Sequence, residues 1–240
     1  MKLPYTLDLS QPFHTRADWQ LVITQETTTE INDKAGAVID QQVGAIHLCF
    51  QSRSEQICPP MGSVNQPGLY MNDIGRAEIV QVGATPLLLV VTEGAVTPFG
   101  HSFGVTTWVW AYRDATDSFD LIFSNGTGVT NHQETRFLEH GPLAGDIIVA
   151  LNPPWGSPPP YPYTITVYRR AGLGAYQQVL HYAARSREGD RNPLAVIDAE
   201  MPEIEKRLHV WRVGQPLPMP QRFPERCKTP EMRHDVEWCD

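Results

Sequence analysis

The stretch "TTWVWAYR" (106–113) has a counterpart later in the chain, "YTITVYRR" (163–170). Alternating Thr, Val and aromatic residues of this kind are typical of β-strands. At an offset of 57 residues the two stretches and the runs that follow them align, with these matched pairs: Thr107 and Thr164, Trp108 and Ile165, Trp110 and Val167, Arg113 and Arg170, Phe119 and Tyr176. The offset therefore predicts a β-structured unit that occurs at least twice.

In each copy, the predicted strands follow one another in the same order. An apolar run precedes the alternating strand and a short strand follows it: "PLLLVV" (86–91) and "FDLIF" (119–123) in one copy, "GDIIVAL" (145–151) and "YQQVLHY" (176–182) in the other. A fainter copy begins with "WQLVIT" (19–24) and "AIHLCF" (45–50). A period near 50 residues predicts propeller blades or a related β-repeat, and the alternative is a β-sandwich of unrelated hairpins. We expect an all-β domain over residues 1–190.

The remaining segment, 191–240, carries the helix signals. In "NPLAVIDAEMPEIEKRLHVW" (192–211), Asn192 can cap a helix and Pro193 suits its first position. Ile204, Leu208 and Trp211 share one helical face. Pro202 is expected to start a second helix or to kink the first. The sequence predicts a short helical segment and an extended Pro-rich tail, both packed on the β-domain.

Composition narrows the classes of partner. The formal net charge is −8, and no stripe of Lys and Arg marks a nucleic-acid surface. No apolar run approaches the ~20 residues of a membrane span. The eight histidines have no ligand spacing on a strand or a helix, so we expect neither a metal nor a cofactor.

Four cysteines fall into two local pairs, Cys49 with Cys58 and Cys227 with Cys239. Their even number and short separations predict two small disulfide loops, and four free thiols are the alternative. Two disulfides indicate an oxidising compartment, and we expect a periplasmic location. Pro4 and Asp8 interrupt the apolar run that a signal peptide needs, so we expect that the chain does not start with one. A periplasmic location then requires an export signal that has been removed from a mature domain.

"GHSFG" (100–104) matches the nucleophile elbow of α/β-hydrolases. An elbow requires a helix directly after the serine, whereas "VTTWVWAY" follows here, and no β-α-β alternation surrounds it. Acid and base candidates for a serine hydrolase are Asp146, Asp190, Asp198, His181 and His209. We expect a glycine-rich loop, and a hydrolase using Ser102 is kept as an alternative.

The long connections of the two clear copies, residues 93–105 and 151–163, combine proline with large aromatic residues. Equivalent loops of a repeat leave on the same side of the fold, so we expect both to contact a protein partner. The candidate contact residues are Phe99, His101, Phe103, Trp155, Tyr161 and Tyr163. Aromatic lids on the core, or a carbohydrate-binding module that stacks sugars on Trp155 and Tyr161, are the alternatives.

The pattern "HGPLAGDIIVAL…YTITVYRR…AYQQV" resembles repeats in bacterial periplasmic proteins with a β-propeller-like, FG-GAP/VCBS-type fold. The resemblance covers about residues 78–182 and rests on a loose motif: Gly141, Pro142, Asp146, Ile147, Ile148, Tyr163, Val167, Tyr168 and Tyr176. That group includes lysozyme inhibitors and immunity proteins, which neutralise toxins from rival bacteria by plugging or masking an enzyme. The acidic calcium loops of some relatives are absent. The resemblance implies a non-enzymatic inhibitor, and the negative charge favours a basic enzyme or toxin as its partner.

Overall fold

A computed structural model describes residues 2–32, 34, 36, 38–42, 44–60, 70–95, 103–128, 133–152, 162–172, 174–187 and 195–215. The chain divides into two compact units. The first comprises residues 1–129 with 172–175, and the second comprises residues 130–171 with 176–240. The division falls between the two predicted copies, whereas the sequence pointed to one β-domain ending at residue 190.

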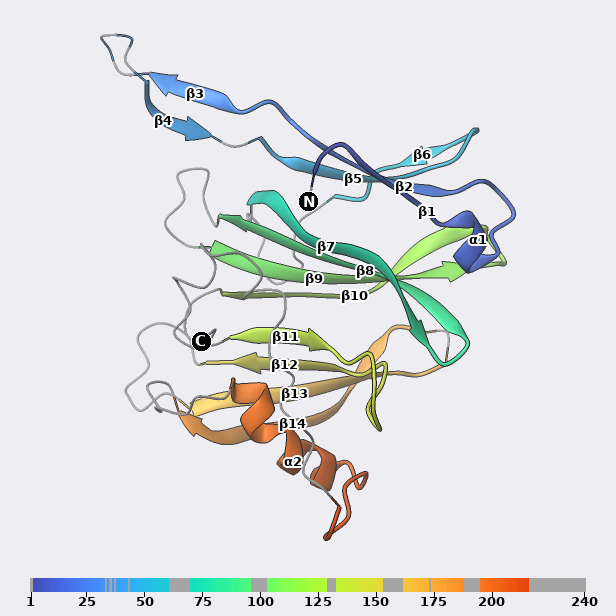
Figure 1. Ribbon diagram of the computed structural model, residues 1–240, viewed down its shortest axis with the longest axis vertical. Helices are drawn as coiled ribbons and strands as arrows, with labels where there is room; N and C mark the ends of the chain where they lie inside the picture. Colours follow the sequence, from blue (N-terminus) through green and yellow to red (C-terminus); the bar gives the residue numbers. More distant parts are fainter. Residues whose placement is uncertain are drawn as a thin grey trace. The chain divides into compact units, whose positions relative to one another are not determined.

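The first unit begins with a four-stranded antiparallel sheet in the order β1 (Tyr5–Asp8), β2 (Gln20–Gln25), β5 (Ile46–Gln51) and β6 (Gln56–Ile57). A short helix, α1 (Ser10–Phe13), joins β1 to β2. A separate hairpin of β3 (Thr29–Asn32) and β4 (Val38–Gln42) is inserted between β2 and β5 and projects from this sheet (Figure 1).

The second sheet of this unit is an antiparallel meander of β7 (Tyr70–Val82), β8 (Thr85–Ala95), β9 (Phe103–Arg113) and β10 (Ser118–Gly128). Gly83 adopts a φ of 61° in the tight turn that pairs Val82 with Thr85. A residue without a Cβ suits this left-handed conformation.

The two sheets of the first unit share one apolar core. Alternate residues of β2 and β5 meet alternate residues of β8 and β9, including Leu21, Ile23, Leu48, Leu88, Val90, Trp108 and Trp110. The Trp108 indole N–H donates to the buried Thr92 hydroxyl at 2.9 Å. Phe50 stacks on Phe119 with ring centroids 4.9 Å apart. The strand alternation read from the sequence thus becomes the inner faces of two packed sheets.

The predicted disulfide between Cys49 and Cys58 joins β5 to the segment after β6, with the two Cα atoms 4.1 Å apart. Cys49 is buried at the edge of the core and Cys58 is exposed. Cys227 and Cys239 lie outside the described residues.

The second unit repeats the meander. Its sheet runs β11 (Glu134–Phe137), β12 (Ile147–Leu151), β13 (Pro162–Arg170) and β14 (Tyr176–Arg187), all antiparallel. A helix, α2 (Val196–Arg207), follows β14 and packs against β12 and β14 (Figure 1). Ile197 and Ile204 of this helix are fully buried in a core with Ile148, Ile165 and Val167.

The offset of 57 residues holds between β9 and β13. Trp108 lies opposite Val90 as Ile165 lies opposite Ala150, and Trp110 lies opposite Leu88 as Val167 lies opposite Ile148. The alignment of Phe119 with Tyr176 is wrong by one pairing position: Ser118 pairs with Arg113, but Tyr176 pairs with Arg170. The reason is a longer β13–β14 turn.

The C-terminal helix differs in detail from its prediction. Its N-cap is Ala195, three residues after the expected cap Asn192, and Asn192 and Pro193 lie outside the described residues. Pro202 lies inside a continuous helix of twelve residues rather than starting a second one. The missing N–H of Pro202 leaves the Asp198 carbonyl without its usual helical donor.

Candidate functional site

The structure describes two of the six partner-binding residues expected from the sequence. Phe99, His101, Trp155 and Tyr161 lie outside the described residues. Phe103 is the first residue of β9, paired with Ala95. Tyr163 was expected in a loop open to a partner, and this is wrong: it lies in β13, only 2% exposed, within the core of the second unit. Pro162 begins the strand, and the alternation of β13 turns Tyr163 inward with Ile165 and Val167.

Ser102 also lies outside the described residues, but the chain directly after it is described. Residues 103–113 form β9, an interior strand of an antiparallel sheet. A nucleophile elbow places a helix at this point, so that the helix N-terminus faces the oxyanion. The strand agrees with a loop between two strands of the repeat.

Three of the proposed acid and base partners of Ser102 make structural hydrogen bonds in the second unit. Asp146 is buried and accepts from the Arg169 guanidinium at 2.7, 2.9 and 3.2 Å. The His181 Nδ1 lies 2.9 Å from the Thr166 hydroxyl. Asp198 accepts from Arg136 at 2.6 Å. His209 lies at the end of α2, and Asp190 is outside the described residues.

Arg136 fixes the start of α2 against the sheet. Its guanidinium donates to Asp198 in the first turn of α2 and, at 2.7 Å and 3.2 Å, to Glu134 in the same strand. Burial lowers the pKa of Arg136, but the two carboxylates outweigh it and the net shift is upward. The cation therefore stays charged, and this buried ion-pair network ties β11 to the helix.

Glu200 holds the next turn of α2 against β14. One carboxylate oxygen accepts from the Tyr182 hydroxyl at 2.9 Å. The other accepts from the backbone N–H of Arg185 at 3.0 Å, and from the N–H and hydroxyl of Ser186 at 3.3 and 3.2 Å. Burial, with the charge of Glu200 and its hydrogen bond, raises the pKa of Tyr182, so the phenol remains a donor. Four donors thus satisfy a carboxylate that is only 4% exposed.

The chain folds back after α2 through a Schellman motif. The N–H of Val210 donates to the Glu205 carbonyl at 2.9 Å, and the N–H of His209 donates to the Lys206 carbonyl at 3.0 Å. His209 occupies the left-handed position, φ 61°, where glycine is usual. Because the motif reverses the chain, Trp211 returns toward the helix it has just left.

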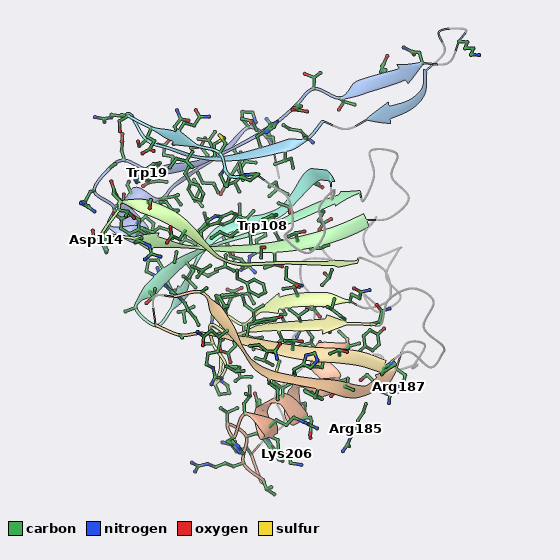
Figure 2. The ribbon with its side chains drawn as sticks, turned by 180° about the vertical axis from the view of Figure 1, so that it is seen from behind. Trp19, Trp108, Asp114, Arg185, Arg187 and Lys206 are labelled. Atoms are coloured by element: carbon green, nitrogen blue, oxygen red, sulfur yellow. A yellow bond between two sulfur atoms is a disulfide. The ribbon has the colours of Figure 1, made fainter. Side chains whose placement is uncertain are left out.

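These elements enclose an open cleft of about 460 Å³ between the end of β14, one side of α2 and the segment after it. Its lining residues are Arg185, Ser186, Ala199, Glu200, Pro202, Glu203, Lys206 and Trp211. Arg185 at the end of β14 and Lys206 on α2 lie at the same end of the unit (Figure 2). We take this cleft as the candidate functional site.

Charged side chains of both signs line the cleft. Glu203 already accepts from Arg207 at 2.8 Å and lies 3.9 Å from the Lys206 ammonium. Arg185 is exposed, and its guanidinium has no hydrogen bond or ion pair in the described part of the chain. The Trp211 Nε1 is shielded from solvent without a described partner. A buried N–H without an acceptor costs about 1–3 kcal/mol. The exposed cations of Arg185 and Lys206 are suited to binding an anionic group.

Only indirect sequence signals point to this cleft. Trp211 was read as a member of the apolar face of a helix, but it lies beyond the C-terminus of α2, and only Ile204 and Leu208 of that set pack on the core. Arg185 and Lys206 carry no motif. The nearest signal was the Lys and Arg pair at the end of the helical segment.

No known protein family and no curated protein matches this sequence. In the described ranges, no three or more His, Cys, Asp or Glu side chains are arranged to hold a metal ion. Among the same residues, no helix combines the length and apolar character needed to cross a membrane.

Proposed function

We propose that this protein is a non-enzymatic binding protein, an immunity protein or inhibitor that masks a secreted bacterial enzyme in the periplasm. The contact surface in this proposal is formed by the connections around Phe99, His101 and Phe103 and around Trp155 and Tyr161. The target is a basic enzyme, because the net charge of −8 speeds association with a positively charged partner.

The observation that carries the proposal is the equivalence of β8–β9 and β12–β13. In both meanders the long Pro- and aromatic-rich connection joins the second and third strands. The connection leaves after the pair Ala95–Phe103 in the first unit and after Leu151–Thr164 in the second. A scaffold that repeats one strand order and varies one connection is typical of recognition by loops, as function commonly lies on loops held by a rigid sheet.

The cleft between β14 and α2 does not favour the enzymatic alternative. Its carboxylates are already held by donors: Glu200 by Tyr182 and the end of β14, and Glu203 by Arg207. A general acid or base has to exchange its proton with a substrate, and a carboxylate that accepts four structural hydrogen bonds is poorly placed to do so.

The test is neutralisation of a candidate enzyme. An immunity gene ordinarily lies beside the gene of its toxin, so the secreted enzyme encoded next to this gene is expressed in bacteria with and without this protein. We expect growth arrest by the enzyme alone and rescue by co-expression in the periplasm. Equal growth arrest in both cultures, with this protein present at the same level as its target, contradicts the proposal.

The serine-hydrolase alternative is tested separately. The purified protein is treated with a fluorophosphonate probe beside a Ser102→Ala variant. We expect no labelling of either protein. Labelling that disappears in the variant would establish Ser102 as a nucleophile and replace the binding proposal with a hydrolase.

A further inference from the structure

We propose that the cleft between β14 and α2 binds an organic monocarboxylate with an apolar body, such as the C-terminus of a peptide or a free organic acid. No residue that lines this cleft belongs to a sequence motif or to the proposed loop surface. The inference is independent of the proposed function, since it concerns a different surface.

The charge expected of the ligand follows from the cations that line the cleft. The exposed Arg185 side chain has no partner in the described part of the chain, and its backbone N–H donates to Glu200. Lys206 has a side chain 66% exposed and one distant contact, the 3.9 Å approach of Glu203. Trp211 lines the cleft as well, but its Nε1 is shielded from solvent. The positive charges of Arg185 and Lys206 favour an anionic group.

The number of charges on the ligand follows from the carboxylates that line the same cleft. Glu200 and Glu203 leave room for one more negative charge more readily than for two, because like charges at short range repel. A carboxylate brings one charge and two oxygens that match the planar fork of a guanidinium. A phosphate brings up to two charges, so we expect it to bind more weakly.

The body of the ligand follows from the remaining walls. Ala199, Pro202 and the Trp211 ring supply apolar surface beside Arg185 and Lys206. Pro202 is fixed inside α2, and the helix-terminating turn holds Trp211, so this surface is ordered before a ligand arrives. Small-molecule sites commonly combine apolar walls with a few convergent polar groups.

The Trp211 indole N–H signal reports occupancy, because Trp211 lines the cleft. In a ¹H–¹⁵N correlation spectrum of the full chain, its signal is identified by its loss in Trp211→Phe. The probe is N-acetyl-phenylalanine, and the matched neutral ligand is N-acetyl-phenylalaninamide, which lacks only the charge. We expect the carboxylate to shift the Trp211 signal in a saturable way, the amide to leave it in place, and inorganic phosphate to bind more weakly.

Variants locate the binding energy. Removing the charge-assisted bonds in Arg185→Gln should weaken the carboxylate about tenfold or more, and Lys206→Gln should weaken it several-fold. Arg212→Gln is the control, because Arg212 is exposed, close in sequence and outside the cleft lining. Preserved dispersion of the spectrum shows that each variant is folded. An unshifted Trp211 signal at saturating probe, equal shifts with acid and amide, or unchanged affinity in Arg185→Gln overturns the proposal. A peptide ending in phenylalanine that binds more tightly than the free probe identifies a peptide C-terminus as the source.

Discussion

Loss of the disulfide between Cys49 and Cys58 should destabilise the first unit by a calculable amount. The bond closes a loop with a sequence separation of 9 residues. The loop-entropy relation for a loop of this length gives about 2.6 kcal/mol at 25 °C. For a urea dependence near 2 kcal/mol per molar, the midpoint of unfolding moves down by about 1–1.5 M. The loop joins β5 to β6, so the second unit should be unaffected.

The assay compares oxidised and reduced protein in a Cys227→Ser/Cys239→Ser background, where only this pair can bridge. Urea unfolding is followed by near-UV circular dichroism, and the signal from Trp19, Trp108 and Trp110 reports the first unit. The Cys49→Ala/Cys58→Ala variant should match the reduced protein and should not respond to reductant. A midpoint that reductant leaves unchanged, or four free thiols in the denatured and unreduced full chain, would refute the reasoning and the oxidising compartment with it.

Three further predictions concern charged groups. Arg136→Met leaves the carboxylates of Asp198 and Glu134 without their cation and should cost about 3–5 kcal/mol in urea unfolding of the second unit; recovery in Arg136→Met/Asp198→Leu/Glu134→Gln is the check. Burial raises the pKa of Glu205 above its ordinary 4.5, so the folded chain loses stability as the pH rises and this carboxyl ionises. The melting temperature of Glu205→Gln should therefore gain on that of the natural chain between pH 4 and pH 7, and a constant difference would contradict this. The Tyr112 hydroxyl lowers the pKa of Asp117 below 3.8, a stabilisation present at neutral pH and lost on acidification, so Tyr112→Phe should unfold at a higher pH in an acid titration followed by circular dichroism.

The strands predicted from the sequence are those whose residues alternate or are apolar throughout. "TTWVWAYR" and "YTITVYRR" became β9 and β13, because Trp108, Trp110, Ile165 and Val167 all have to face a core. β7 was missed. Its sequence "YMNDIGRAEIVQV" is polar, it lies at the edge of its sheet, and two register shifts break the alternation that a sequence pattern depends on.

The cleft was beyond the reach of sequence patterns for a different reason. Arg185 belongs to a strand, Lys206 to a helix and Trp211 to the turn after it, and the hydrogen bonds of Glu200 bring the first two elements together. None of these residues forms a motif with a neighbour. The local disulfide was predictable, because strand pairing brings residues a short distance apart in the chain close together in space.

The measurement that tests the proposed binding function most directly is a pair of values for Trp155→Ala: its dissociation constant for the secreted enzyme encoded beside this gene, and its melting temperature. If Trp155 anchors the interface, binding weakens by at least ~2 kcal/mol, about 30-fold, while the melting temperature stays that of the natural chain. A lowered melting temperature with unchanged affinity would show that Trp155 packs on the protein itself, and would contradict a partner surface at this loop.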